Sequence, residues 1–90
     1  MNEERSLVRK AVALKYEMGK DEVPRVIAKG ERLLAEKIIS IAQEKGIYIY
    51  EDPTLVALLG RLEVGSEIPE TLYRAVAEIL VFVFRLEGKV

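Results

Sequence analysis

The stretch AVALKY, residues 11–16, decides how the chain folds, because its large and small side chains alternate with a period of two. In an extended chain Val12, Leu14 and Tyr16 fall on one face, and the two alanines fall on the opposite face. This alternation predicts a strand over residues 8–16. The alanine face is small enough for a helix to pack close to it.

Two further strands are expected, with a helix between them. Residues 25–29 follow a turn marked by Gly19 and Pro24, and residues 47–50, with the sequence IYIY, are β-branched and aromatic, which favours a strand. The order strand, helix, strand implies a parallel, right-handed crossover between these two strands. The sequence therefore predicts one βαβ unit.

The helix of this unit is predicted over residues 31–45. Its apolar positions repeat at helical spacing, and Gly46 follows at the position where a left-handed residue would end the helix. The residues expected to form its buried stripe are Leu34, Ile38, Ile41 and Ala42.

Two more helices complete the expected fold. Asp52 can cap a helix over residues 53–62, which has a proline at its first position. The last helix is predicted over residues 69–87, because helical spacing of apolar residues continues through ILVFVF, residues 79–84, despite the strand propensity of that segment. The expected fold class is α/β, with residues 1–90 as a single domain. It is a small mixed sheet of about three strands packed by three helices, in the order β-β-α-β-α-α.

Composition excludes several classes of function. The chain has no cysteine and no histidine, so it lacks the usual thiolate nucleophile, sulfur-based metal sites and the usual general base. Its 14 basic and 15 acidic residues are scattered, so no basic stripe attracts nucleic acid, and its isolated glycines form no phosphate-binding loop. We expect no enzymatic activity, cofactor, metal ion or nucleic acid. The longest apolar run, residues 79–84, is too short to insert across a membrane.

The balance of polar residues points to a source that lives at high temperature. Asn2 and Gln43 are the only side-chain amides, while 32% of the residues are charged. This combination is typical of thermophilic proteins, in which ion pairs are favoured and thermolabile amides are avoided. A thermophilic source is therefore expected.

The adjacent acids Glu51 and Asp52 allow two interpretations. A pair of carboxylates can perform acid–base catalysis, whereas acids at the start of a helix act as caps and interact with the helix dipole. We prefer capping, because Pro53 suits the first helical position.

Three segments in this order and spacing resemble the cytoplasmic domain of the FlhB family, the switch component of flagellar and other type III secretion machines. They are AVALKY (11–16), VPRVIAKG (23–30) and YEDPTLVALLGRLEVGSEIPETLYRAVAEIL (50–80). The resemblance extends over residues 7–88. It implies a module that helps to choose, through contacts rather than turnover, which class of export substrate is secreted.

The sequence differs from the family that it resembles at the self-cleavage motif. Full-length members have an N-terminal membrane portion and cut themselves at an Asn-Pro-Thr-His motif just before the first strand of this domain. The motif's positions align with Ser6, Leu7, Val8 and Arg9, none of which matches. Self-cleavage by that route is therefore not expected. The chain begins where the C-terminal fragment of a cut member would begin, so we expect that fragment to be made here as a separate protein.

A binding site and partners follow from the same resemblance. In the family, a shallow apolar pocket is proposed to receive a short motif of early substrates, and its residues correspond to Val23, Pro24, Ala77 and Leu80. The alternative is that these residues are ordinary packing. The implied partners are export components, rod- and hook-type substrates and a ruler protein. The implied location is cytoplasmic, including a peripheral position at the export apparatus on the inner face of the membrane.

Two functions remain open from the sequence. The first is an export-specificity module, which binds substrates or substitutes for the C-terminal fragment of FlhB. The second is an assembly or structural accessory role, in which the chain pairs with a membrane-bound homologue or with itself and binds no substrate.

The purified chain is expected to stay intact at neutral pH, because the cyclising asparagine and the following proline are absent from residues 6–9. Mass spectrometry of the stored protein measures this. A fragment that starts at Leu7 or at Pro53 would contradict the prediction.

Overall fold

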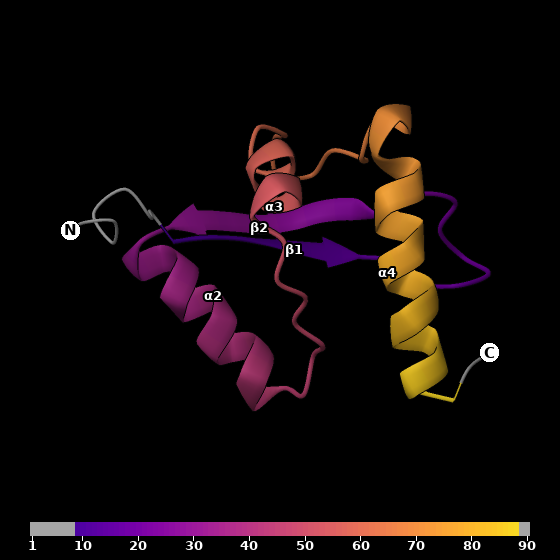
Figure 1. The fold of residues 1–90 in the computed structure, drawn as a ribbon, viewed down its shortest axis with the longest axis horizontal. Coiled ribbons are helices and arrows are strands. Elements are labelled where there is room, and N and C mark those ends of the chain that lie inside the picture. Colours follow the sequence, from indigo (N-terminus) through magenta and orange to yellow (C-terminus); the bar gives the residue numbers. More distant parts are fainter. Residues whose placement is uncertain (1–8, 89–90) are drawn as a thin grey trace.

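Two antiparallel strands run through the centre of the fold (Figure 1). The structure is a computed structural model that describes residues 9–88. Strand β1 (Lys10–Lys15) pairs with β2 (Arg25–Glu31), and the register shifts between Ala13 and Leu14. The elements that follow are α2 (Leu33–Glu44), α3 (Pro53–Leu59), a 3-10 turn (Glu70–Leu72) and α4 (Tyr73–Leu86).

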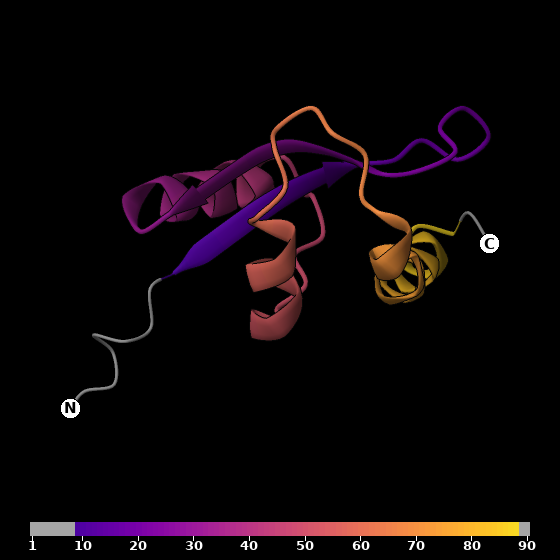
Figure 2. The ribbon, with the colours of Figure 1, turned by 90° about the horizontal axis from the view of Figure 1, so that it is seen from above.

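The two faces of the strand pair carry different helices. Val12 and Leu14 pack against a buried apolar cluster that joins α3 to α4. The buried members of this core cluster are Leu55, Leu59, Ile68 and Val76. Helix α2 lies on the other side of the strands (Figures 1 and 2). The alanines of β1 alternate with Val12 and Leu14 and therefore face that side. The predicted strand and its two unequal faces are thus confirmed over Lys10–Lys15. Of the other predicted positions, Val8 lies outside the described residues and Tyr16 follows the strand.

Helix α2 approaches the strands closely where the sequence provides small residues. A Cβ atom at Gly30 would lie 2.4 Å from Cγ of Leu34, and Ala35 is completely buried. The predicted buried stripe of this helix is wrong at Leu34 and Ile41, which are 52% and 40% exposed. The face of α2 that is fully buried is the one that carries Ala35, whose small side chain fits the close approach to the strands.

Residues 47–50 do not form the predicted third strand. They lie between α2 and α3 without a strand partner, and the described part of the chain contains no parallel crossover. Gly46, with a φ angle of 70°, ends α2, and the following segment carries the chain from one side of the strands to the other (Figures 1 and 2). A segment that crosses the strands steeply cannot build a ladder of hydrogen bonds with them. Within residues 9–88 the sheet is therefore two-stranded and antiparallel rather than mixed. The side chains of IYIY stay exposed.

The outer edge of β2 is bonded by the turn before α4 instead. Val26 N–H donates to the Ser66 carbonyl at 2.9 Å, and Gly65 N–H donates to the Val26 carbonyl at 2.7 Å. Arg25 reinforces this contact, because its guanidinium donates to the Gly65 carbonyl at 2.6 Å and to the Glu67 carboxylate at 3.3 Å. These bonds occupy the first residues of an edge that could otherwise pair with another chain.

Side chains fix both ends of α3. Asp52 Oδ1 accepts a hydrogen bond from Leu55 N–H at 3.0 Å, so this carboxylate caps the helix as predicted. At the other end, the Lys29 ammonium on β2 donates to the carbonyls of Gly60 at 3.1 Å and of Leu62 at 2.7 Å. A half-buried lysine thus satisfies carbonyls left at the helix end and ties α3 to the sheet.

Helix α4 stands across the strands, near the end of β1 (Figure 1). It contains residues 79–84, so the prediction of a helix there is confirmed. Val76 is 1% exposed, and Ile79 and Leu80 pack against the core cluster, whereas Leu86 is 61% exposed. The helix is therefore anchored through its first half.

Replacing Lys29 with methionine is expected to lower the free energy of unfolding by about 2 kcal/mol, because the apolar stem remains while two carbonyls lose a charged donor. Urea unfolding followed by circular dichroism measures the change. Lys10→Met, at the exposed start of β1, is the control and should change the free energy of unfolding by less than about 0.5 kcal/mol. Wild-type stability of Lys29→Met would show that the ammonium contributes nothing.

Candidate functional site

The four residues that the family resemblance assigns to a binding pocket come together in the structure. Val23, Pro24, Ala77 and Leu80 all line one cavity of about 280 Å³, between the turn that leads into β2 and helix α4. We refer to it as the apolar pocket. Its other lining residues are Tyr16, Glu22, Ile68, Tyr73, Val76, Val81 and Phe84.

The predicted residues differ in how deeply they lie. Pro24 is buried, and its carbonyl accepts a hydrogen bond from Ile68 N–H at 3.0 Å, which fixes the start of β2 against the segment before α4. Val23 and Leu80 are half-buried and pack against the core cluster. Ala77 is exposed, so its methyl group is open to solvent and does not serve as core packing.

Aromatic rings that the sequence analysis did not select form much of the pocket wall. Tyr16, just after β1, has its ring centroid 6.1 Å from that of Phe84 on α4. Tyr73 and Val81 lie on the same wall and are 42% and 44% exposed. Tyr73, Ala77, Val81 and Phe84 are spaced by three or four residues, so helical periodicity around Ala77 is the signal that could have found them.

The chemistry of the apolar pocket is that of a binding surface. Glu22 is the one charged group among its lining residues within the described chain. The remaining side chains are apolar or aromatic and offer no arrangement of nucleophile, acid and base. Nor does any group of three or more potential metal ligands occur in residues 9–88. The pocket can therefore bury an apolar side chain of another molecule.

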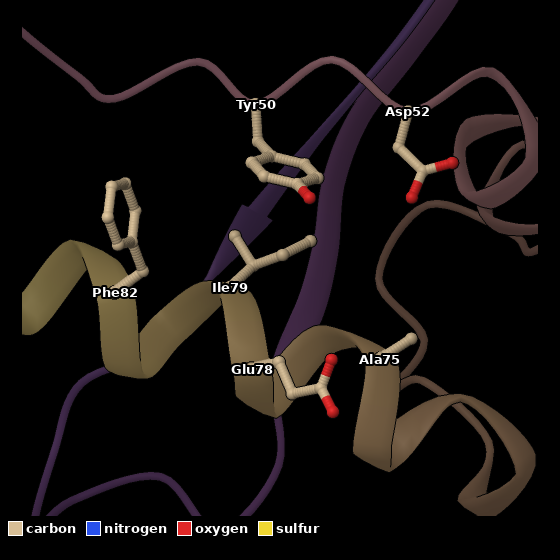
Figure 3. Close-up of a pocket in the computed structure, with 6 residues that line it drawn as sticks. All are labelled: Tyr50, Asp52, Ala75, Glu78, Ile79 and Phe82. Carbon is tan, nitrogen blue, oxygen red and sulfur yellow. The ribbon is translucent and has the colours of Figure 1, made fainter.

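A second cavity uses residues from another face of α4 than the apolar pocket does. Figure 3 shows the side chains that line it. Its volume is about 370 Å³, and the segment that leads into α3 forms its other wall. The lining residues are Tyr50, Asp52, Ala75, Glu78, Ile79 and Phe82. We refer to it as the acidic pocket, because both of its charged groups are carboxylates.

The sequence matches a defined protein family over most of its length. A profile of the FlhB, HrpN, YscU and SpaS family matches residues 8–83. The chain belongs to this family. Among related proteins, YlqH of Bacillus subtilis is 48% identical over 87 residues, which cover 97% of this chain and 94% of YlqH.

Comparison with longer members of the FlhB family and with solved structures shows which part of those proteins this chain resembles. Flagellar biosynthetic protein FlhB of Aquifex aeolicus is 44% identical over 81 residues, which cover 89% of this chain but 23% of that protein. The cytoplasmic domain of FlhB from Shewanella putrefaciens is 40% identical with a TM-score of 0.77, covering 86% of this chain and 64% of that one. The PscU C-terminal domain is 32% identical with a TM-score of 0.78, covering 82% of this chain and 95% of that one. The fold is therefore that of the C-terminal, cytoplasmic domains of this family.

Of the four positions aligned with the FlhB-family cleavage motif, the structure describes one, Arg9. Ser6, Leu7 and Val8 lie outside the described residues. Arg9 is exposed, and its carbonyl accepts a hydrogen bond from Arg32 N–H at 2.8 Å, which joins the start of β1 to the end of β2. Among the helices in residues 9–88, none combines the length and apolar character that a bilayer crossing needs.

Proposed function

We propose that this FlhB-family chain is a non-enzymatic, cytoplasmic binding module of the flagellar or type III export apparatus, which contributes to the choice of export substrate. The convergence of Val23, Pro24, Ala77 and Leu80 on one cavity carries the proposal. These residues come from segments more than fifty positions apart in the sequence, yet they align one by one with the residues that the family resemblance assigns to substrate recognition.

The expected ligand is a short motif with one or two apolar side chains from a rod-, hook- or ruler-type protein. A cavity of about 280 Å³ is near the lower limit for ligand sites, so it accommodates side chains rather than a folded surface. Tyr73 and Val81 are exposed around it, and an apolar side chain that covers them would gain free energy from their burial. By the same contacts, the chain could substitute for the C-terminal fragment of FlhB.

A second candidate function is assembly with a membrane-bound homologue or with another copy, without substrate binding. The observation that favours it is the run of exposed apolar residues at 47–50, which is unusual for a surface segment. Substrate binding by the purified wild-type chain distinguishes the two functions, because the assembly role predicts none.

Ala77→Glu is expected to weaken binding of a purified rod or hook subunit at least about tenfold, because docking would bury an unpaired carboxylate. Isothermal titration calorimetry measures the affinity. The fold should stay intact, since Ala77 is exposed in the free protein, and thermal unfolding followed by far-UV circular dichroism tests this.

Thr71→Glu is the control with the same change of charge, because Thr71 is also exposed, in the 3-10 turn before α4, and lines neither cavity. It should leave the affinity for the subunit within about twofold of wild type. Full binding by Ala77→Glu would place the substrate elsewhere, and unfolding of Ala77→Glu would make this residue part of the core.

A further inference from the structure

We propose that the acidic pocket is a second docking site, which receives a partner segment that carries an arginine or lysine next to an apolar side chain. This inference goes beyond the proposed function, since it assigns a separate cavity and a ligand of different chemistry. It rests on how apolar and charged groups are divided within the cavity.

The acidic pocket has an apolar part and a charged part (Figure 3). The carboxylates of Asp52 and Glu78 lie toward one end, and Phe82 lies at the other, with Ile79 between them. The ring of Tyr50 lies across from Ile79 and forms the opposite wall. A ligand that matches this arrangement has an apolar group and a cationic group a few ångströms apart, as neighbouring residues of a peptide do.

Two aromatic side chains of the acidic pocket are about half exposed to solvent. Tyr50 is 51% exposed and Phe82 is 48% exposed. The Phe82 ring also makes an edge-to-face contact with the ring of Tyr48, at a centroid distance of 5.7 Å. Rings in this state provide pre-arranged area for an apolar side chain, and their faces also attract a cation.

The two carboxylates lack a cationic partner in residues 9–88. Asp52 uses Oδ1 to cap α3. Among residues 9–88, the ion pairs and the hydrogen bonds from lysine and arginine side chains involve neither Asp52 nor Glu78. Like charges that face one cavity repel each other, and a cation placed between them is attracted to both. The charge of the pocket therefore selects a guanidinium or ammonium group, and a guanidinium can bond to a carboxylate through two N–H groups.

The acidic pocket can work independently of the apolar pocket. Ala75, Ile79 and Phe82 follow each other at intervals of four and three residues along one face of α4. Ala77 and Val81, four residues apart, lie on another face of the helix. One short peptide cannot fill both cavities without passing around the helix. A partner bound in the acidic pocket thus leaves the apolar pocket free for a substrate.

The test uses the full chain labelled with ¹⁵N and a probe peptide in which leucine and arginine alternate. Amide resonances of Tyr50, Glu78 and Phe82 are expected to shift on titration, and binding should weaken as salt is raised. A control peptide with glutamine in place of arginine should bind at least about tenfold more weakly. Equal binding of the two peptides, or shifts centred on Ala77 and Leu80, would overturn the proposal.

Two variants with the same change of charge distinguish binding at the acidic pocket from non-specific electrostatic attraction of the peptide. Glu78→Lys should weaken arginine-peptide binding at least about tenfold, while Glu63→Lys, in the exposed turn before α4, should stay within about twofold of wild type. Equal losses in both variants would show that only net charge matters and would overturn the site. Ala77→Glu should bind this peptide like wild type, so failure here and failure of the proposed function are distinguishable.

Discussion

The antiparallel register of β1 and β2 is the constraint on which the other contacts depend. Val12 lies opposite Lys29, and cross-strand neighbours share a face of the sheet. Val12 therefore packs on the core cluster while the Lys29 ammonium reaches the carbonyls at the end of α3. A slip of one residue would turn Lys29 toward α2 and leave those carbonyls without their donor. The register thus sets both the position of the core and the attachment of α3.

Helix α4 gives this small fold more binding surface than its core would suggest. Its buried residue, Val76, anchors the helix, and the faces on either side of that contact remain open. Each face meets a different segment, the turn before β2 on one side and the segment before α3 on the other. One helix therefore supplies a wall to two cavities of opposite character, one almost free of charge and the other with two carboxylates.

Elements defined by local chemistry could be predicted from the sequence, and elements defined by distant contacts could not. The alternation in β1, the Asp52 cap and the helical spacing through residues 79–84 all correspond to the structure. Residues 47–50 have the propensity of a strand, but no neighbouring strand runs alongside them, so propensity gave the wrong answer. The four pocket residues came from family resemblance, whereas Tyr16 and Phe84 required knowledge of how the residue after β1 packs against α4.

The walls of the apolar pocket come from two segments that are far apart in the sequence. Tyr16 and Pro24 form one wall, and Ala77 and Phe84 form the other, so the cavity does not exist in the unfolded chain. A molecule that fills it binds the folded state alone and stabilises that state by mass action, by about 2.7 kcal/mol at a free concentration one hundred times its dissociation constant. The lifetime of the domain against unfolding and proteolysis thereby becomes a measure of how often the pocket is filled.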